Sequence, residues 1–577
     1  MAKPKIVVIG GGLAGLMATL KAAEEGAEVE VYSLVPPKRS HSATAQGGIN
    51  GAIDTKGEGD SPQKHFEETI YGGDFLANQP PVKNFCEAAP GIIYMFDRMG
   101  VMFNRTPEGL IDLRRAGGTK YSRVAFAGGT TGQQMMYALD EQVRKLEAEG
   151  GVRVYFPWEF LSAVIDDGGI CRGVVVQDLI SMEIHAVRAD AVIIATGGIG
   201  YLFGRSTNGI MNTGSAQSAL YQQGACYANG EFIQIHPTAI PGEDKCRLMS
   251  ETCRGEGGRI WVYKDGKPWY FLEEWYPKYG NLVPRDIATR AIFKVCVEMG
   301  LGIDGQNKVY LDLSHIDPKH LERRLSGILD IYEIFVGEDP RKVPMQIFPA
   351  VHFTMGGLWV DYNHMTNIPG LFAAGECEYQ YHGANRLGGN GMPACTYAGG
   401  VAGQKAVEYA RGRQEKSPPR PELLEAEKKR QEEMEARIRS MEGPENPYLL
   451  HQELGEWMNN NVTVVRYNDR LKETDNKILE LMDRYRRIGI ADKSGWSNQV
   501  VPFTRRLWHM LQLARVITIG ALLRNESRGA HYKPEFPERD DVNWLKTTKA
   551  YFTPDGPRFE YEPVDTSLLE PRPRRYD

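Results

Sequence analysis

Five polar segments, far apart along the chain, carry cations and hydrogen-bond donors: QIHPT at 234–238, SETCRGEGG at 250–258, PRD at 284–286, HFTMGG at 352–357 and NRLGGN at 385–390. Considered one at a time, His236 and His352 are each typical of a hydrogen-bonded histidine in a protein core. Arg285, next to an aspartate, is typical of a structural ion pair. Taken together, two arginines and two histidines suit a substrate with two carboxylates, because the guanidinium fork matches carboxylate geometry. No GxSxG string and no Cys–His pairing accompanies them, which disfavours acyl transfer.

A glycine motif near the start of the chain fits a dinucleotide phosphate site. The pattern G-x-G-x-x-G lies between a short apolar stretch, 5–9, and a helical pattern, 13–25. Such glycines allow a tight turn and let a pyrophosphate approach the N-terminus of the helix. The motif alone is weak, but its βαβ context favours dinucleotide binding. The residues assigned to this turn are Gly10, Gly12, Leu13, Ala14 and Gly15.

The next predicted strand, 28–32, distinguishes between two dinucleotides. An NAD site of this type carries Asp or Glu about 20 residues after the glycines, where it holds the ribose hydroxyls. Here the strand ends at Ser33, which can bond a ribose hydroxyl but lacks the carboxylate, so the pattern favours FAD. The polar segment 38–51 follows, where a flavin ring would approach, and it contains His41.

Two further buried strands are predicted at 189–195 and 370–374. The roughly 170 residues between them contain many aromatic residues and prolines, which suits an inserted domain. Of the 63 glycines, 55 lie in residues 1–403, so the composition changes near residue 403.

The second part of the chain is predicted to be helical. A proline-rich joint at 416–421 precedes the charged stretch 422–441, expected to be a solvent-facing helix. Apolar residues at helical spacing in 478–490 and 503–523 predict a small helical bundle. The proline- and charge-rich segment from 551 onward is expected to lie over a surface rather than fold by itself.

Composition excludes several classes of function. The 577 residues include 68 Lys and Arg against 74 Asp and Glu, a formal net charge of −6, which makes nucleic acid an unexpected partner. No run of about 18 apolar residues and no signal-peptide pattern occurs, which predicts a soluble chain.

The cysteines and histidines limit the metal sites that this chain could carry. Eight cysteines without a CxxC pair predict a reducing compartment, and they place any iron–sulfur cluster on another chain. The histidines show no metal-ligand spacing, so no metal site is predicted.

Several strings, in order along essentially the whole chain, carry a family resemblance: GGGLAGL at 10–16, RSHSATAQGGINGA at 39–52, GEFIQIHPTAIPG at 230–242, RGEGG at 254–258, NLVPRDIATR at 281–290, HFTMGGLWVD at 352–361, GLFAAGE at 370–376, GANRLGGN at 383–390, SRGAH at 527–531 and PERDD at 537–541. The sequence resembles the flavoprotein subunit of succinate dehydrogenase and fumarate reductase. The resemblance is greatest to the menaquinone-linked bacterial branch of that family.

The resemblance implies an α/β fold in which a Rossmann-like FAD-binding domain is interrupted by an α+β capping domain. A C-terminal helical domain and an extended tail follow. The boundaries expected for these parts are 1–240 and 353–412 for the FAD-binding domain, 241–352 for the capping domain, 413–535 for the helical domain and 536–577 for the C-terminal segment.

The resemblance also implies site roles. FAD would be attached covalently through His41. The dicarboxylate would be held by His236, Ser250, His352 and Arg386, with Phe126 beside it. Hydride would pass between the flavin and one substrate carbon, Arg285 would exchange a proton at the other carbon, and Glu251 and Arg254 would relay that proton. Further flavin contacts would come from Ser33, Ser40, Gln46, Gly47, Gly48, Glu376, Asn390, Gly391 and Met392.

The implied partners are an iron–sulfur subunit that takes the electrons and a membrane-anchor subunit of the cytochrome b type with a quinone site. These partners would hold the chain peripherally on the cytoplasmic side of the cell membrane. Three positions depart from the common family pattern. Ser250 stands where many members have threonine, Gly214-Ser215 replaces Gly-Asp, and Gly391-Met392 replaces Ser-Leu.

Two alternatives remain. The first is a related flavoenzyme, either L-aspartate oxidase or a soluble fumarate reductase; His41 in its RSH string disfavours the oxidase, and the absence of CxxCH strings disfavours the periplasmic reductases. The second is a flavin-bearing electron carrier without catalysis, which the presence of Arg285, Glu251 and Arg254 disfavours.

Overall fold

A five-stranded parallel sheet organises the first part of the chain. The computed structural model describes residues 3–242, 246–413 and 420–576. The sheet order is β19-β10-β1-β2-β6. The predicted strands around 5–9, 28–32, 189–195 and 370–374 are confirmed as its members. The sheet brings them together although more than 360 residues separate the first from the last in sequence. The strands are β1 (Lys5–Ile9), β2 (Glu28–Tyr32), β6 (Val152–Tyr155), β10 (Ala191–Ile194) and β19 (Leu371–Ala373).

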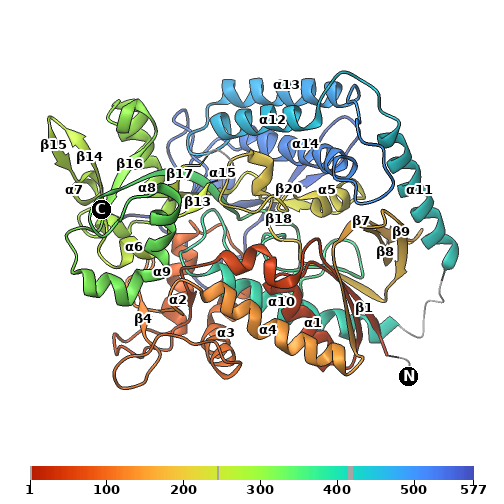
Figure 1. The fold of residues 1–577 in the computed structure, drawn as a ribbon, viewed down its shortest axis with the longest axis horizontal. Coiled ribbons are helices and arrows are strands. Elements are labelled where there is room, and N and C mark those ends of the chain that lie inside the picture. Colours follow the sequence, from red (N-terminus) through yellow and green to blue (C-terminus); the bar gives the residue numbers. More distant parts are fainter. Residues whose placement is uncertain (1–2, 243–245, 414–419, 577) are drawn as a thin grey trace.

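Both faces of this sheet are covered, which explains why β1 after Lys5, β10 and β19 contain only apolar residues. Alternate residues of β1 point to opposite faces. Ile6 and Val8 belong to the core formed with the helices drawn along the bottom of Figure 1, whereas Val7 and Ile9 belong to the core on the other face. The helices on the lower face are α1 (Leu13–Glu24), α3 (Gln79–Arg98), α4 (Thr131–Ala148) and α10 (Gly391–Arg413).

Helices α1 and α10 approach each other very closely. A Cβ atom on Gly399 would lie 2.3 Å from the carbonyl oxygen of Ala14, and one on Gly403 would lie 2.4 Å from that of Ala18. Because both obstacles are backbone atoms, only glycine fits at these two positions without moving a helix. The pair of glycines therefore sets the distance between the two helices whose N-termini face the centre of the molecule.

A second body of structure, called the capping region (residues 233–242 and 246–354), is built on an antiparallel sheet. The sheet order is β13-β12-β17-β16-β14-β15. It has a hydrophobic core of its own, drawn in green at the left of Figure 1. The strands are β12 (Ile233–Ile240), β13 (Arg247–Leu248), β14 (Arg259–Lys264), β15 (Lys267–Trp269), β16 (Val309–Asp312) and β17 (Met345–Thr354); the helices are α6 (Thr252–Gly255), α7 (Phe271–Trp275), α8 (Arg285–Phe293) and α9 (Pro318–Val336).

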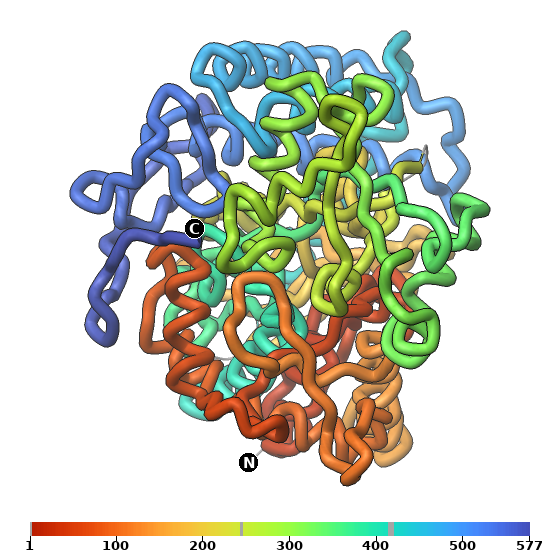
Figure 2. Tube along the Cα trace, turned by 90° about the vertical axis from the view of Figure 1, so that its left-hand side faces the viewer, coloured from red at the N-terminus to blue at the C-terminus, as the bar shows by residue number. Residues whose placement is uncertain are grey.

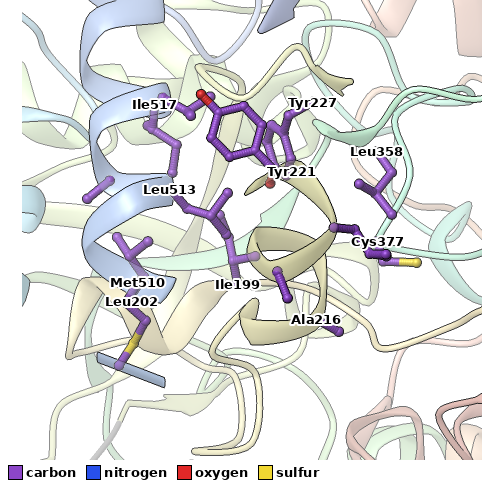
Figure 3. Packing of buried hydrophobic residues seen from close by; sticks show 14 of the residues in the cluster. Ile199, Leu202, Ala216, Tyr221, Tyr227, Leu358, Cys377, Met510, Leu513 and Ile517 are labelled. Carbon is purple, nitrogen blue, oxygen red and sulfur yellow. The ribbon is translucent and has the colours of Figure 1, made fainter. Parts of the chain in front are cut away.

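The predicted helical bundle is confirmed, but it shares its core with the part of the chain built on the central parallel sheet. Figure 3 shows Met510, Leu513 and Ile517 of α14 packed with Ile199 and Tyr221, more than 280 residues earlier in the chain. This shared core belongs to the upper face of the central sheet. The helices are α11 (Pro421–Arg439), α12 (Pro447–Asn461), α13 (Asn468–Tyr485) and α14 (Val500–Leu523), with α5 (Ser215–Gln222) beside them.

Helix α11 is more buried than its sequence predicts. It is charged, as predicted, but it buries Gln431, Glu435 and Ile438 instead of facing solvent on all sides. The Glu435 carboxylate accepts a hydrogen bond from Gln177 and lies 3.5 Å from a guanidinium nitrogen of Arg505. Buried ionic partners on other elements therefore fix this helix, which composition alone could not show. Most of the proline-rich joint at 416–421 lies outside the described residues.

The C-terminal segment is only partly an extended tail. Strands β20 (Lys546–Tyr551) and β21 (Arg558–Pro563) form a hairpin that joins β11 (Tyr227–Ala228) and β18 (Gly357–Leu358) in a four-stranded sheet. The remaining residues, 564–576, run to the capping region, where Arg574 pairs with Asp286 (Figures 1 and 2). In the described parts of the chain, no helix is long and apolar enough to cross a membrane.

Candidate active site

A cavity of about 470 Å³ lies between the central sheet and the capping region. One end is formed by the turn after β1 and the ends of β2 and β10, and the other end by residues of β12, β17 and α8. The carboxyl ends of the parallel strands converge on it, which is where ligands bind in open α/β sheets. Nearly all predicted site residues therefore share one cavity, although they come from segments hundreds of residues apart.

The glycine turn closes the dinucleotide end of the cavity. Gly10 has φ = +111°, and a Cβ there would lie 2.2 Å from the carbonyl oxygen of Ala195. A Cβ on Gly15 would lie 1.9 Å from the carbonyl oxygen of Gly10, so Gly15 allows the helix to pack against the turn. Gly12 and the start of α1 line the cavity, which leaves the N-terminus of a helix open to a phosphate. The other predicted residues lining this end are Leu13, Ala14 and Ser33.

The segment after β2 forms the wall beside this turn. His41 begins the short 3₁₀ helix η2 (His41–Thr44), lines the cavity and lies with its Nε2 3.2 Å from the side-chain nitrogen of Asn208. Gln46 also lines the cavity, and its Oε1 is buried with no hydrogen-bond partner among the described residues. Ser40, Gly47 and Gly48 complete this wall.

Glu376 faces the cavity from the segment after β19. Burial raises the pKa of its carboxyl to about 7, although the Thr354 backbone N–H, which donates a hydrogen bond to Oε1 at 3.1 Å, acts in the opposite direction. A Cβ on Gly198 would lie 2.3 Å from Glu376, so glycine at 198 makes room for the carboxyl group. The carboxyl group is thus buried beside the cavity and suited to accept hydrogen bonds from hydroxyl groups.

The cavity wall fits a large polar occupant such as FAD. Five buried polar atoms on it have no hydrogen-bond partner among the described residues, which is rare for buried polar groups in a protein that needs no ligand. They include both donors and acceptors, and they are spread over both ends of the cavity. These atoms are Gln46 Oε1, Thr196 Oγ1, Asn212 Oδ1, His236 Nε2 and Arg386 Nε.

At the other end, two histidines lie edge to face with ring centroids 4.9 Å apart. Burial lowers the pKa of His236 and of His352 well below the usual value, and nearby arginines lower both further, so both rings are neutral. The Thr238 backbone N–H donates to Nδ1 of His236 at 3.2 Å, which places the proton of this ring on Nε2. His236 therefore presents an unused N–H donor to the cavity, while Nδ1 of His352 is hydrogen-bonded to the Thr207 hydroxyl at 2.7 Å.

Ser250 presents a hydroxyl group to the same end of the cavity. Its oxygen accepts hydrogen bonds from the Thr252 backbone N–H at 3.3 Å and from the Thr252 hydroxyl at 2.9 Å. With the oxygen already accepting twice, the Ser250 hydroxyl hydrogen is left to donate. Ser250 thus adds one more neutral donor to those of the histidines.

Three charged side chains form a line at the edge of the cavity. The Glu251 carboxylate lies between Arg285, whose Nε is 3.2 Å from Oε1, and Arg254, whose Nη2 is 2.8 Å from the same oxygen. Burial alone would raise the pKa of Glu251, but the two guanidinium groups outweigh it and hold the pKa at about 2. Arg254 itself is fully buried, and burial lowers its pKa. The three groups make one continuous chain of hydrogen bonds from the cavity into the capping region, with the Glu251 carboxylate as the acceptor between two guanidinium donors.

Gln234 was not among the predicted site residues, although it lies in the QIHPT string. Its side-chain oxygen accepts a hydrogen bond from Arg285 Nη1 at 2.8 Å, and its side-chain nitrogen donates to the Arg386 carbonyl at 2.7 Å. It therefore holds two arginines in a fixed relation. The only sequence signal was its position two residues before His236, on the same face of β12.

Comparison with known families shows which one this chain belongs to. The family described as "FAD binding domain" matches residues 5–392, and that described as "Fumarate reductase flavoprotein C-term" matches residues 451–576. A succinate dehydrogenase flavoprotein subunit of Bacillus subtilis is 65% identical over 100% of this chain and 99% of its own length. The chain belongs to the family of succinate dehydrogenase and fumarate reductase flavoprotein subunits.

Solved structures show the same relationship. An Escherichia coli quinol fumarate reductase matches with a TM-score of 0.93 at 33% identity, over 99% of this chain and 98% of the other. A quinol–fumarate reductase with menaquinol molecules matches with a TM-score of 0.91 at 34% identity, over 99% and 100%. These matches confirm the predicted fold class, with its FAD-binding part, capping region and C-terminal helices.

Four predicted site residues do not line the cavity: Gly15 and Arg254, whose places behind its wall are given above, and Phe126 and Asn390. Phe126 lies beneath the guanidinium groups of Arg114 and Arg324, at 3.9 and 4.9 Å from its ring centroid. It directly follows β5 (Val124–Ala125) but, unlike Val124, it is not among the residues that line the cavity. The structure therefore does not bring Phe126 to the dicarboxylate end of the cavity.

Asn390 acts behind the cavity wall rather than on it. Its Nδ2 donates to the Thr69 hydroxyl at 3.0 Å, and its Oδ1 accepts from Asn50 and lies 2.8 Å from His65 Nε2. It precedes α10 and ties this helix to α2 (Pro62–Gly72). Gly391 and Met392, the first residues of α10, do line the cavity.

The remaining departures from the common family pattern also lie on the cavity. Ser215 is the first residue of α5 and lines the wall there. A Cβ on Gly391 would lie 2.8 Å from Nη1 of Arg386, so the missing side chain gives this guanidinium its room. The Arg386 guanidinium also lies over the Phe353 ring at 4.2 Å. Among the described residues, no cluster of His, Cys, Asp and Glu could hold a metal ion.

Proposed function

We propose that this chain is the catalytic subunit that interconverts succinate and fumarate, with FAD bound in the cavity. The observation that carries the proposal is the line Arg285–Glu251–Arg254, which opens onto a pocket of neutral donors and the Arg386 guanidinium. When bound, FAD supplies the hydride acceptor for succinate and the hydride donor for fumarate. The chain's own residues supply binding, orientation and the proton.

The pocket suits a dianion with two separated carboxylates. Arg386 and Arg285 supply positive charge, and the guanidinium fork can hold a carboxylate through two hydrogen bonds. His236, His352 and Ser250 supply donors without charge, because burial keeps both histidines neutral. Charged and neutral donors together can bind both ends of a short dicarboxylate while the carbons between them stay in a fixed position.

Arg285 is the group placed to exchange a proton with the substrate. A guanidinium is a weak acid in water, so the role requires a partner that restores the lost proton at once. Glu251 is within hydrogen-bond distance of Arg285 Nε and of Arg254 Nη2, and it can carry a proton between them. Arg254 donates in turn to the carbonyl of Asn281 at 2.7 Å, toward the outside of the capping region.

His41 is proposed as the covalent attachment point of FAD. It lines the cavity at the end of the wall formed by residues 40–48, and its Nε2 contacts Asn208. Ser33, Gln46, Glu376 and the turn at Gly10–Gly15 would hold the rest of the dinucleotide. Denaturation of the purified chain provides a direct check: flavin that stays with the polypeptide supports attachment, and complete release refutes it.

The proposed partners are an iron–sulfur subunit and a membrane-anchor subunit of the cytochrome b type with a quinone site. Support comes from the relatives, whose solved structures include a quinol–fumarate reductase with menaquinol molecules. In such an assembly the chain would lie peripherally on the cytoplasmic side of the membrane. Co-purification from native membranes, with iron and haem measured, tests this part of the proposal.

The activity is tested with the chain purified together with its natural partners. Succinate plus quinone and fumarate plus reduced quinone are assayed in parallel, with L-aspartate as a third substrate. We expect both dicarboxylate reactions, and we expect Arg285→Gln to abolish them while bound FAD is retained. Oxidation of L-aspartate in place of succinate, or unchanged turnover by the variant, would overturn the assignment.

A further inference from the structure

The last described residues form a strap across the molecule. This C-terminal strap, residues 564–576, begins after β21 and runs past the start of α3, where the Gln79 side chain accepts hydrogen bonds from the backbone N–H groups of Leu568 and Leu569. It then reaches Tyr71, whose hydroxyl donates to the Arg575 carbonyl at 3.1 Å. Its end lies beside the green capping region in Figures 1 and 2. The strap therefore connects the FAD-binding part with the capping region.

Arg574 makes this connection through two buried carboxylates. Its Nη2 lies 2.6 Å from Asp286 Oδ2, and its Nη1 lies 3.4 Å from Asp74 Oδ2. The Arg574 side chain is only 7% exposed, and those of Asp286 and Asp74 are 1% and 9% exposed. Asp74 belongs to the FAD-binding part and Asp286 to the capping region, so one guanidinium bridges the two parts away from water.

Other cations face the same two carboxylates, but they are not equivalent to Arg574. Asp74 also binds Arg539 at 2.8 Å and accepts the backbone N–H of Gly529. Asp286 has Arg290 at 3.4 Å on its own helix, and its Oδ1 has no hydrogen-bond partner among the described residues. Loss of Arg574 would therefore leave Asp74 well paired and Asp286 nearly uncompensated.

Tyr576 anchors the end of the strap in the capping region. It is 4% exposed and belongs to the hydrophobic core of that region. Its ring lies 5.0 Å from the ring of Tyr279 and 5.7 Å from that of Tyr71. Tyr279 directly precedes the 3₁₀ turn η4 (Gly280–Leu282), whose Asn281 carbonyl receives the hydrogen bond from Arg254.

The two anchor points of the strap flank the segment that carries the proposed proton path. Asp286 is the neighbour of Arg285 in the first turn of α8, and Tyr279 lies six residues before Arg285. We propose that Arg574 is a positioning residue: by neutralising Asp286 it holds the start of α8 so that Arg285 stays within reach of Glu251 and Gln234. This inference rests on the proposed function, because it assigns Arg574 a role in the same reaction.

The test compares Arg574→Gln with Arg575→Gln in the enzyme purified with its partners. Both changes remove one positive charge from the strap, but the Arg575 side chain is exposed. In Arg574→Gln we expect kcat for succinate oxidation to fall about tenfold or more, since misplacement by about 1 Å can cost about 100-fold in rate. The KM should change by less than about threefold, because Arg386, His236, Ser250 and His352 are held by other elements. Arg575→Gln should match the wild type.

Two further measurements separate positioning from general destabilisation. Amide hydrogen exchange should speed up in α8 of Arg574→Gln while α1 and α10 stay protected. Addition of Arg574→Gln to Asp286→Asn should cost little beyond Asp286→Asn alone, because both changes remove the same contact. If Arg574→Gln does not fold, Arg574→Lys is measured in its place. This variant should fold, and it should have a lower kcat than the wild type with an unchanged KM.

The outcomes also separate this inference from the proposed function. A wild-type complex that does not oxidise succinate refutes the function, whereas the exchange of α8 can still be measured. A wild-type complex that is active, with Arg574→Gln equal to it in kcat and in exchange of α8, overturns the role of Arg574 alone. Equal losses in Arg574→Gln and Arg575→Gln, or fully additive losses in the double variant, would also overturn it.

Discussion

At residue 391, a missing side chain sets the position of Arg386. The common family pattern has serine at this position, and a Cβ here would come within 2.8 Å of the guanidinium. The obstacle is the end of a flexible side chain, so a larger residue would displace Arg386 rather than unfold the protein. Glycine at 391 therefore belongs to the dicarboxylate pocket, although it offers no side chain to the substrate.

We expect Gly391→Ser to weaken dicarboxylate binding. The displaced Arg386 should lose part of a charge-assisted interaction, and the KM for succinate should rise about three- to tenfold, a cost of about 1 kcal/mol. FAD content should stay the same. Met392→Leu, which also restores a common family residue on the same wall, is the control and should leave KM unchanged. A Gly391→Ser enzyme with the KM of the wild type contradicts this prediction.

The sequence indicated most of the site residues but not how they interact. Arg285, Glu251, His236 and His352 could be singled out because charged and titratable residues cluster in short strings. Phe126 was assigned to the site by the family resemblance alone, and no local pattern indicates that its ring packs against Arg114 instead of lining the cavity. The bridging of Arg285 and Arg386 by Gln234 depends on contacts of β12 with α8 and with the segment before α10, which no local pattern encodes.

At the scale of elements, the contact of α1 with α10 places two helix N-termini at the cavity. We expect Gly399→Ala to push the helices apart, because its Cβ would lie 2.3 Å from a backbone oxygen. The cost should be about 1–3 kcal/mol of stability, with weaker retention of FAD before it is covalently attached.

The neighbouring glycine provides the control for this prediction. A Cβ on Gly400 would meet only side-chain atoms of Met17 and Lys21 at 3.7 and 3.8 Å, which is ordinary contact. Gly400→Ala should therefore be neutral or stabilise the helix by up to about 1 kcal/mol. Thermal unfolding midpoints of the two variants, measured side by side, check both expectations; equal midpoints would contradict the close-packing argument.

The link between α2 and α10 predicts a dependence on pH. Burial lowers the pKa of His65 to about 3, with nearby Arg123 acting in the same direction and the hydrogen bond to Asn390 opposing it. Since the ordinary pKa is near 6.5, the unfolded chain binds a proton that the folded chain rejects. The stability that His65 contributes is present above pH 6.5 and is lost as the pH falls toward 3, by up to about 1.4 kcal/mol per pH unit.

We therefore expect His65→Gln to make the unfolding midpoint less sensitive to acid between pH 6.5 and 4. The glutamine can keep a hydrogen bond to Asn390 but takes up no proton on unfolding. His185→Gln, at an exposed histidine whose side chain is 45% accessible, should retain the pH dependence of the wild type. Parallel curves for the wild type and His65→Gln would show that this histidine does not set the acid response.

For the whole molecule, one hydrophobic core joins residues from β1 to β20. The strands and the existence of the C-terminal helices could be predicted, because their apolar periodicity is local. The shared core could not, because it pairs Leu513 with Ile199 and Met510 with Leu202, which only the tertiary fold brings together (Figure 3). The burial of α11 could not be predicted for the same reason, because nothing in its polar sequence indicates its contact with Gln177.

This shared core predicts that the C-terminal helices and the FAD-binding part unfold together. We expect loss of helical circular dichroism and exposure of the flavin to occur at the same temperature, in a single transition. The capping region, with its own core, is the part that could separate. Loss of C-terminal helix well below the temperature at which the flavin becomes exposed would contradict a shared core.

Because the histidines beside them are neutral, the guanidinium groups set the charge of the dicarboxylate end of the cavity, and this charge affects how the protein behaves in common buffers. At the dicarboxylate end, Arg254, Arg285 and Arg386 outnumber the nearby carboxyl groups of Glu251 and Glu376, so the pocket has an excess of positive charge. Any short dianion that fits will relieve this repulsion and stabilise the folded state in proportion to the logarithm of its concentration. Buffers such as malonate, citrate or tartrate would then act as ligands, and melting temperatures or inhibition constants measured in them would report on the buffer as well as on the protein.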